Sequence, residues 1–307
     1  MDLRAVRVLV TGGTGYVGRH AVRVLLERGA TVRVLSRSLV DLPAGVELAL
    51  GDVCHARQVR RAIAGCQAVL HLAASPLAQS AAYPLHDFRV NALGTLLLLR
   101  AAAGEGTERF IYASSSAVYG LPGAGPVGED CHPMPRSPYG ASKLCGEIYC
   151  HTFGQTEGLA YTIFRLFNVL GVPVDERPRP TVDARFIRRA LAGQAPIIDH
   201  HPGNSFDFVD VRDVAEALVR ALERDATIGQ VCNIAAGHGI SLNELALAVC
   251  RVVGLSLRPI IRDPRPAPIV WEADTSRLRA LLDLQPRSCL DGPLQESVEW
   301  FRRRALH

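Results

Sequence analysis

A glycine-rich turn near the N-terminus constrains the fold of this chain more than any other feature. Residues 11–18 read Thr-Gly-Gly-Thr-Gly-Tyr-Val-Gly and directly follow an apolar, β-branched run at 6–10 that has the length of one buried strand. Apolar residues at helical spacing follow over 18–28, and Gly29 ends that pattern. A strand, a tight turn and a helix in immediate succession predict the first unit of a parallel α/β sheet.

The same alternation of strand and helix patterns continues as far as residue 166. Further strands are expected at 31–35, 46–50, 69–73, 110–113 and 161–166, and helices at 57–64, 91–103 and 139–153. The predicted fold class is therefore α/β, with a Rossmann-type, doubly wound parallel sheet that is covered by helices on both faces.

The character of the sequence changes after residue 168, where prolines become frequent. Four helical patterns lie between these prolines, at 182–192, 211–224, 242–253 and 294–303. We expect residues 1–170 to form the sheet domain and residues 171–307 mainly a smaller α/β lobe, with some segments shared between the two. Ligands of open α/β sheets bind at the carboxyl ends of the strands, so the smaller lobe is predicted to close over that crevice and bind substrate.

The composition argues against several classes of function. The 307 residues are 48% hydrophobic, and the net charge of +4 arises from scattered arginines, which disfavours a nucleic-acid partner. The apolar runs are too short to span a bilayer, and the N-terminus lacks a signal-peptide pattern. The eight cysteines form no CxxC pair and no regular spacing with histidine. We therefore expect reduced thiols, no metal site, no membrane association and a cytoplasmic location.

The glycine turn predicts a dinucleotide-binding site. Glycines at this position permit the tight turn, a close approach of the backbone to a pyrophosphate, and close packing of helix on strand, while the helix N-terminus supplies free N–H groups. Residues that follow the next strands should line the same site. The candidate cofactor residues in these segments are Gly12, Gly15, Tyr16, Val17, Gly18, Ser36, Arg37, Asp52, Val53, Leu72, Ala73 and Ala74.

The end of the second strand bears on the choice between NAD and NADP. An acidic residue there would bind the ribose hydroxyls of NAD, but this chain has Ser36 and Arg37. A guanidinium can hold a 2′-phosphate through paired hydrogen bonds, which favours NADP. Arg37 is equally compatible with a solvated loop or with stacking on adenine, so both cofactors stay open.

Tyr139 and Lys143 are the candidate catalytic pair. They lie four residues apart and share one face of the expected helix, where an ammonium favours the phenolate and makes it a usable general acid/base. Lys143 is the only lysine in a chain that otherwise uses arginine, which indicates that an ammonium is needed there. A row of hydroxyls, from Ser114 to Ser116, ends the fifth strand. One of these serines is expected to bracket a reacting C–OH group together with Tyr139.

Several spaced motifs extend along nearly the whole chain. They include TGGTGYVG at 11–18, HLAAS at 71–75, NALGT at 91–95, YASSSAVYG at 112–120, SPYGASK at 137–143, FRLFNVLG at 164–171 and DFVDVRDVAEA at 207–217. In this set the sequence resembles the extended short-chain dehydrogenase/reductases, in their NAD-dependent nucleotide-sugar epimerase/dehydratase branch.

The resemblance implies roles for individual residues. Ser115 is the implied catalytic hydroxyl, Tyr139 the acid/base and Lys143 its partner, and Asn91 fits an asparagine that braces the active-site helix. Asn91, Tyr139 and Lys143 are also expected to contact the cofactor. The implied contacts to a nucleotide-diphosphate sugar are Ser115, Ser116, Tyr139, Asn168 and Arg265, with Arg265 on the diphosphate.

The chain departs from the family pattern at one position that bears on the substrate. Members usually read Arg-Asp-Phe where this chain has Phe206, Asp207 and Phe208, so the arginine that meets the diphosphate is absent. Four explanations are open. Arg265 acts alone, Arg185 or Arg188 compensates, the nucleotide binds differently, or the substrate is not a common UDP-sugar.

The resemblance leaves more than one reaction open. A 4-epimerase that works by hydride transfer through a 4-keto intermediate fits best, and the alternatives are an NADPH-dependent 4-ketosugar reductase and a non-catalytic dinucleotide sensor. A 4,6-dehydratase of this family carries Asp-Glu after its catalytic hydroxyl, where this chain has Ser116 and Ala117. Elimination of water by the dehydratase route therefore lacks its acid and base.

A homodimer is expected because relatives often pair through the helices at 91–103 and 139–153. The apolar residues that would suit this contact are Leu96, Leu97, Leu99 and Ala103. They would equally suit burial against the sheet.

Overall fold

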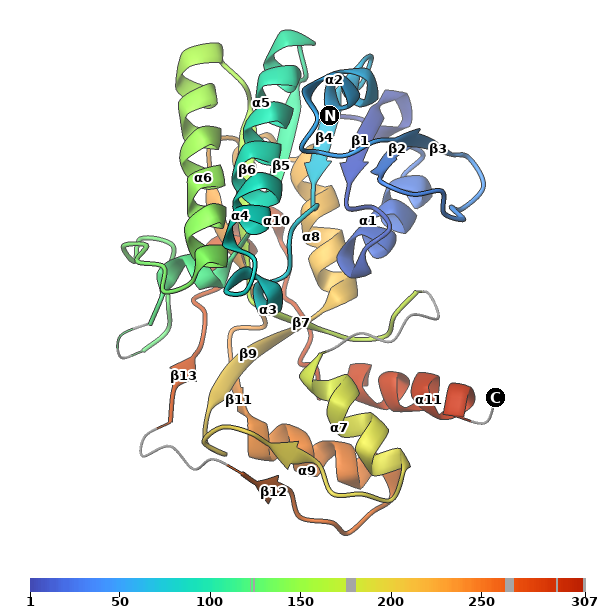
Figure 1. Ribbon diagram of the computed structural model, residues 1–307, viewed down its shortest axis with the longest axis vertical. Helices are drawn as coiled ribbons and strands as arrows, with labels where there is room; N and C mark the ends of the chain where they lie inside the picture. The colour runs from blue at the N-terminus through green and yellow to red at the C-terminus, as the bar shows by residue number, and fades with distance from the viewer. Residues whose placement is uncertain (122, 124, 175–180, 263–267, 291, 306–307) are drawn as a thin grey trace.

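Two lobes lie one above the other along the long axis of the molecule (Figure 1). The computed structural model describes residues 1–121, 123, 125–174, 181–262, 268–290 and 292–305. The upper lobe in this view holds the N-terminus and a large sheet, and the lower lobe holds smaller sheets and the C-terminal helix.

Seven parallel strands form the sheet of the upper lobe. In chain order they are β1 (Arg7–Thr11), β2 (Thr31–Ser36), β3 (Val46–Leu50), β4 (Ala68–His71), β5 (Arg109–Ser115), β6 (Tyr161–Leu166) and β10 (Val231–Ile234). Their spatial order is β10-β6-β5-β4-β1-β2-β3, so the direction of winding reverses between β1 and β4. This confirms the Rossmann-type fold class, and the reversal marks the crevice where such sheets bind ligands.

Helices cover both faces of this sheet because successive side chains of a strand point to opposite sides. On one face lie α1 (Tyr16–Glu27), α8 (Val211–Glu223) and α10 (Ser276–Leu282), and on the other lie α2 (Ala56–Ile63), α5 (Gly94–Gly104) and α6 (Pro138–Glu157). Within β1, Val8 and Val10 belong to the first core and Leu9 to the second. The inner strands β1, β4 and β5 are buried on both faces, as the sequence predicted for a parallel sheet, whereas the edge strand β3 is partly exposed.

The C-terminal half of the chain contributes to the upper lobe. The sequence placed the helix at 211–224 in the smaller lobe, but α8 packs against α1 and buries Val214 and Leu218 in the core that contains Val8. In addition, β10 pairs with β6 and forms an edge of the large sheet. The chain thus returns to the first sheet after β9, and α8 and β10 are segments of the C-terminal half that belong to the upper lobe.

The lower lobe combines short strands with three helices. The strands of its main sheet are β7 (Asn168–Leu170), β9 (Ser205–Asp210), β11 (Gly239–Ser241) and β13 (Val270–Trp271), and β9 pairs with each of the others. A second pair joins β8 (Ile197–Ile198) and β12 (Ile260–Ile261). The helices α7 (Val182–Leu191), α9 (Leu242–Val253) and α11 (Pro293–Ala305) match three of the predicted helices.

The helix expected at 91–103 has a more complex start than its sequence pattern suggested. Two short helices, α3 (Leu77–Ser80) and α4 (Pro84–Phe88), come first, and a π-helical turn over Arg89–Leu93 leads into α5. Asn91 lies within this π turn. Such turns are frequent at functional sites because they rotate a side chain out of the regular helical register.

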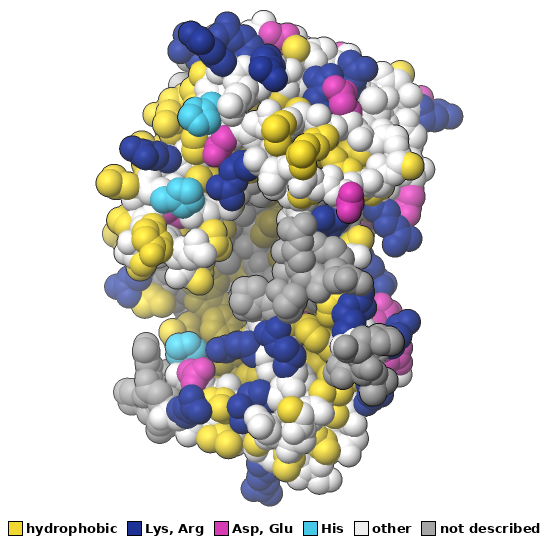
Figure 2. Space-filling view, turned by 45° about the vertical axis from the view of Figure 1, so that its right-hand side comes forward, with side chains coloured by type: hydrophobic (Ala, Val, Ile, Leu, Met, Phe, Trp, Pro, Cys, Tyr) yellow, Lys and Arg dark blue, Asp and Glu magenta, His cyan; other side chains and the backbone are white. Residues whose placement is uncertain are grey.

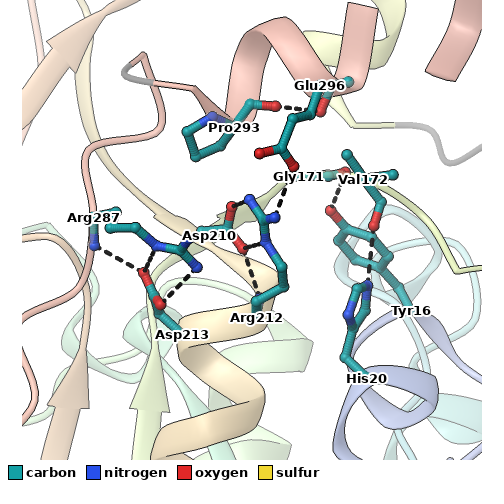
Figure 3. Close-up of polar contacts among 11 residues, drawn as sticks. Tyr16, His20, Gly171, Val172, Asp210, Arg212, Asp213, Arg287, Pro293 and Glu296 are labelled. Atoms are coloured by element: carbon teal, nitrogen blue, oxygen red, sulfur yellow. Dashed lines mark hydrogen bonds and ion pairs between the residues drawn. The ribbon is translucent and has the colours of Figure 1, made fainter. Parts of the chain in front are cut away.

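Polar contacts join the two lobes beside the glycine turn (Figure 3). The hydroxyl of Tyr16 donates to the carbonyl oxygen of Gly171 at 2.7 Å, and Nε2 of His20 lies 3.0 Å from the carbonyl oxygen of Val172. Two ion pairs connect α8 to the C-terminal segment, Arg212 with Glu296 at 2.7 Å and Asp213 with Arg287 at 3.0 Å. The N-terminal end of α1 thus holds the segment that leads into the lower lobe.

Candidate active site

The glycine turn after β1 leaves no room for larger residues. Gly12 has a positive φ of 70°, and a Cβ atom on it would lie 2.7 Å from the backbone nitrogen of Ala73. A Cβ atom on Gly18 would collide with the carbonyl oxygen of Gly12. The turn, the first helical residues and the strand end at Ala73 are therefore packed backbone to backbone, as the sequence predicted for a phosphate-binding turn.

A pocket of about 410 Å³ lies at the carboxyl ends of β1, β2 and β4. Of the twelve cofactor candidates in the glycine turn and at the strand ends, nine line the pocket, namely Gly12, Gly15, Ser36, Arg37, Asp52, Val53, Leu72, Ala73 and Ala74. The other three do not. The side chain of Tyr16 reaches Gly171, Val17 packs against the core, and Gly18 packs on the turn. Any cofactor contact from these three would come from the backbone at the start of α1.

Ser75 also lines the pocket and was missed by the sequence analysis. Its Oγ is buried and has no hydrogen-bond partner among the described residues, while its N–H donates to Oδ1 of Asn91 at 2.8 Å. A buried hydroxyl without a protein partner beside a pocket is expected to meet a ligand group. Together with the glycine cradle, this hydroxyl fits a bound dinucleotide.

Ser36, Arg37 and Asp52, at the strand ends on the adenosine side, bear on the choice between NAD and NADP. The hydroxyl of Ser36 is already used, since it donates to the carbonyl oxygen of Ser38 at 2.9 Å. Arg37 is exposed and lines the pocket. Oδ1 of Asp52 accepts the N–H of Cys54 at 2.9 Å, which shapes the turn after β3. Of these side chains, the guanidinium of Arg37 has the greatest freedom to meet a cofactor.

Ser115, Tyr139 and Lys143 come together at the ends of β5 and α6. Ser115 is the last residue of β5, and its Oγ accepts the N–H of Ala117 at 3.2 Å. Tyr139 lies in the first turn of α6, which Ser137 caps, and Lys143 follows one helical turn later. Burial raises the pKa of Tyr139, and its contact with the Ser115 hydroxyl opposes that rise. Ser115 and Tyr139 are therefore in contact, and Lys143 lies one helical turn from Tyr139.

Lys143 is the most unusual charged group in this region. Its side chain is only 2% exposed, and its Nζ lies 4.5 Å from the centre of the Tyr112 ring. Burial lowers the pKa of Lys143 to about 8. An ammonium that is close to losing its proton near neutral pH is typical of a catalytic rather than a structural lysine.

Asn91 connects the pocket to the catalytic helix. Its Oδ1 accepts from Ser75, which lines the pocket, and its Nδ2 donates to Oγ of Ser142 at 3.1 Å. Ser142 precedes Lys143 in α6. The predicted brace is therefore present as two hydrogen bonds that reach both parts of the site.

The residues expected to contact the substrate lie in separate segments of the chain. Figure 2 shows a hollow between the lobes, with hydrophobic side chains inside it and Lys or Arg side chains along its lower rim. Asn168 in β7 donates through Nδ2 to the carbonyl oxygen of Asp207 at 3.4 Å. Ser116 begins a short 3₁₀ helix over Ser116–Tyr119, directly after Ser115. Arg265, the expected diphosphate contact, lies outside the described residues.

The position that carries phenylalanine instead of arginine lies in β9. The ring of Phe206 packs at 6.2 Å from the ring of Phe208 and belongs to the edge of the lower core. Asp207 accepts the backbone N–H groups of Ala236, Gly237 and Ala273, so its carboxylate organises loops. The two arginines considered as substitutes both contact other residues. Arg185 forms a hydrogen bond with Asp199, and the guanidinium of Arg188 lies over the ring of Phe301.

Comparison with known proteins places this architecture among relatives of high similarity. The family model for the NAD dependent epimerase/dehydratase family matches residues 8–235. The UDP-glucose 4-epimerase of Azospirillum brasilense is 33% identical over 320 residues, which cover 96% of this chain and 92% of that protein. The chain belongs to the NAD dependent epimerase/dehydratase family.

Solved structures agree with this membership. The UDP-glucose 4-epimerase of Thermotoga maritima, crystallised with UDP-glucose, superposes with a TM-score of 0.90 at 30% identity and covers 97% of this chain and 99% of its own. The UDP-glucose 4-epimerase of Thermus thermophilus in complex with NAD has a TM-score of 0.84 at 32% identity, with 96% and 99% covered. As in this family, the chain has a nicotinamide dinucleotide site.

The epimerase/dehydratase match includes all the candidate cofactor and catalytic residues, and it ends before Arg265. No helix within the described part of the chain is long and apolar enough to cross a membrane. The described residues also contain no group of three or more His, Cys, Asp or Glu side chains that could hold a metal ion.

Proposed function

We propose that this protein is a nucleotide-sugar 4-epimerase that works through a 4-keto intermediate and keeps NAD bound. The observation that carries the proposal is the assembly of Ser115, Tyr139 and Lys143 beside a dinucleotide pocket. When bound, the nicotinamide would accept a hydride from the sugar carbon and return it.

The side chains of this site would supply proton transfer and orientation. Tyr139 takes the hydroxyl proton as the sugar carbon is oxidised and gives it back as the ketone is reduced. Ser115 holds the reacting oxygen through a hydrogen bond. The Ser115 hydroxyl opposes the effect of burial on the pKa of Tyr139. An ammonium one helical turn away, that of Lys143, would also favour the phenolate form of Tyr139. With a nicotinamide bound, return of the hydride to the opposite face of the ketone would invert the carbon.

The named relatives support an epimerase. Those of Azospirillum brasilense and Mycolicibacterium smegmatis are UDP-glucose 4-epimerases, and a solved relative from Methanobrevibacter ruminantium is a UDP-N-acetylglucosamine 4-epimerase. A dTDP-glucose 4,6-dehydratase from Streptomyces niveus is also similar, at 29% identity. The short helix after Ser115 begins with Ser116 and Ala117, which provide no carboxyl groups for elimination of water. This favours epimerisation over dehydration.

A second candidate function is an NADPH-dependent 4-ketosugar reductase. Arg37 favours it, because this exposed guanidinium lines the adenosine end of the pocket where a 2′-phosphate would lie. A reductase would use the same three catalytic residues but would exchange its reduced cofactor after every turnover.

One experiment separates these functions. The purified protein is incubated with UDP-glucose, and separately with UDP-N-acetylglucosamine, without added cofactor, and the sugars are followed by NMR. We expect interconversion of the 4-epimers with no net change in absorbance by reduced cofactor. A protein that converts neither sugar, but reduces a nucleotide-4-ketosugar with consumption of added NADPH in proportion to product, would replace the epimerase with the reductase. Failure to convert any nucleotide sugar despite a bound dinucleotide would favour the sensor.

The matched variants for this assay are two tyrosines of the same helix. Tyr139→Phe removes the proposed acid/base and should lower kcat by about 10²- to 10⁴-fold. Tyr149→Phe removes a hydroxyl farther along α6 and should leave kcat unchanged.

We also propose that two copies pair through α5 and α6, which lie side by side (Figure 1). Of the expected apolar residues, Leu99 is buried against the sheet, whereas Leu96, Leu97 and Ala103 are half-buried. Ile148 of α6 is 56% exposed, which suits a contact with a second copy. Light scattering should give a dimer that Ile148→Glu dissociates, and a monomeric parent protein would contradict the pairing.

A further inference from the structure

A fully buried aspartate lies beside the candidate catalytic residues. Asp87 belongs to α4, and its side chain has 0% exposure. Its Oδ2 accepts from Nδ2 of Asn91 at 2.9 Å, and its Oδ1 accepts from Oγ of Ser142 at 2.5 Å. Because Ser142 is next to Lys143 in α6, the carboxylate of Asp87 joins α4 to the catalytic helix.

Asp87 fixes the orientation of the Asn91 amide. A carboxylate can only accept hydrogen bonds, so the NH₂ group of Asn91 must face Asp87. The amide oxygen then faces Ser75, whose N–H it accepts at 2.8 Å. The π turn places Asn91 between the two contacts. The brace between the cofactor pocket and α6 thus depends on one buried carboxylate.

The negative charge of Asp87 has no neutralising partner. Among the described residues, no arginine, lysine or histidine forms an ion pair with it, whereas the nearby carboxylate of Glu147 is paired with Arg165 at 2.8 Å. The 2.5 Å bond from Ser142 is in the range of a hydroxyl that donates to a charged carboxylate. Lys143 is a buried cation that directly follows Ser142, the hydrogen-bond partner of Asp87.

Groups from four elements act on Lys143. Burial lowers the pKa of Lys143, while Glu147 and Cys150 from its own helix and Asp87 from α4 raise it. The Tyr112 ring of β5 lies under the ammonium, and the charge of Lys143 in turn helps to lower the pKa of His71 in β4. The largest of these raising contributions comes from Glu147, which is paired with Arg165, whereas Asp87 forms no ion pair among the described residues.

We propose that Asp87 is a positioning residue of the Tyr139–Lys143 pair, which holds Asn91 and Ser142 by hydrogen bonds and brings a buried negative charge to the helix turn that carries Lys143. The inference rests on the proposed function only in taking Tyr139 and Lys143 as an acid/base pair. It assigns Asp87 no contact with substrate or cofactor.

The proposal fixes the direction of a pH effect. Loss of a nearby negative charge destabilises an ammonium, so removal of the Asp87 charge lowers the pKa of Lys143. Burial raises the pKa of Tyr139, the Ser115 hydroxyl lowers it, and Asp87 raises it further, so removal of the charge also lowers the pKa of Tyr139. Both limbs of the pH–rate profile should therefore move toward acid.

The only lysine of the chain makes this effect directly measurable. Protein labelled with ¹³C at the lysine Cε carbon gives one lysine NMR signal, and its titration reports the pKa of Lys143 without a need for assignment. We expect Asp87→Asn, which keeps the shape of the side chain, to lower that pKa. Ser142→Ala removes a hydrogen bond but keeps the charge, and Asp41→Asn removes an exposed charge outside the site, so neither should shift it.

The outcomes are distinct from those of the activity assay. An unchanged lysine titration in Asp87→Asn, or an equal shift in Ser142→Ala, overturns the proposal even if the protein is an active epimerase. The predicted shift supports it even if no nucleotide sugar is turned over, because the measurement needs no substrate. Asp87→Ser removes the same charge with a smaller side chain and is titrated if Asp87→Asn does not fold. In an active enzyme, a pH–rate profile of Asp87→Asn with an unmoved alkaline limb would also contradict it.

Discussion

The carboxylate of Glu147 and the guanidinium of Arg165 form an ion pair of 2.8 Å in a region where both side chains are almost fully buried. The same carboxylate accepts the hydroxyl of Ser114 at 2.5 Å, immediately before the catalytic candidate Ser115. The pair thereby anchors α6 to β5 and β6 behind the active site.

Removal of one partner from this pair should be severe. Glu147→Ala leaves the Arg165 charge buried without compensation, which costs about 3–5 kcal/mol of the free energy of unfolding. Denaturant unfolding measures this loss. Glu27→Ala, which breaks the exposed pair with Arg23, is the control and should cost less than about 0.5 kcal/mol. Similar losses in the two variants would contradict the role given to Glu147.

A substitution in the glycine turn should affect both stability and cofactor binding. In Gly18→Ala the added methyl group meets the carbonyl oxygen of Gly12, so the turn must open, at a cost of about 1–3 kcal/mol. We expect a lower melting temperature and weaker dinucleotide binding by calorimetry. Gly104→Ala adds the same methyl group at the end of α5, where nothing lies within 4 Å, and should change stability by less than about 1 kcal/mol, in the stabilising direction.

His71 should make the protein sensitive to acid. It is buried between the hydroxyls of Thr11 and Thr95, at 2.6 and 2.9 Å, and burial lowers its pKa to about 3. The unfolded chain binds a proton at this histidine below a pH of about 6.5, whereas the folded protein does not until about pH 3. As the pH falls from about 6.5 to about 3, this residue alone should therefore lower the free energy of unfolding by about 1.4 kcal/mol for each pH unit.

The variant His71→Asn tests whether His71 causes this loss of stability as the pH falls. It should be less stable than the parent at pH 8, because hydrogen bonds are lost, but its stability should decline less steeply from pH 6.5 to 4. His132→Asn alters an exposed histidine and should leave the slope unchanged. An equal slope in His71→Asn and the parent protein would mean that His71 is not the cause.

Arg37 should distinguish the two nicotinamide cofactors. If its exposed guanidinium meets a 2′-phosphate, Arg37→Ala loses a charged hydrogen bond worth about 1.5–3 kcal/mol and raises the Kd for NADPH by at least about tenfold. The Kd for NAD should change by less than about threefold, since NAD has no phosphate there. Fluorescence titration of both cofactors measures this difference. Equal changes for the two would remove the evidence that Arg37 offers for NADP.

Local patterns predicted much of the upper lobe and the centre of the site. The glycine turn was identifiable because its backbone conformation and close contacts require glycine at Gly12 and Gly18. Tyr139 and Lys143 were identifiable because four residues of spacing on a helix fix their relation. Each of these relations is set within a few residues of chain, and the structure places them as expected.

Features that depend on distant parts of the chain were not predicted. β10 joins β6 through a pairing that has no local signal, and α8 reads as an ordinary amphipathic helix whichever sheet it covers. Ser75 and Asp87 were missed for a similar reason. Each is a common polar residue in a short segment. Its role in the site is recognisable only from its buried hydrogen bond with Asn91. The short strands of the lower lobe, such as β13, are too brief for a pattern.

The contribution of β10 to the large sheet also has a consequence for synthesis on the ribosome. The sheet cannot acquire its last strand until residues 231–234 have left the exit tunnel, long after β6 at 161–166 has emerged. During that interval the outer edge of β6 presents unpaired backbone groups, which are a template for pairing with another nascent chain. A nascent chain whose translation stalls between β6 and β10 would therefore be the form of the protein that aggregates most readily.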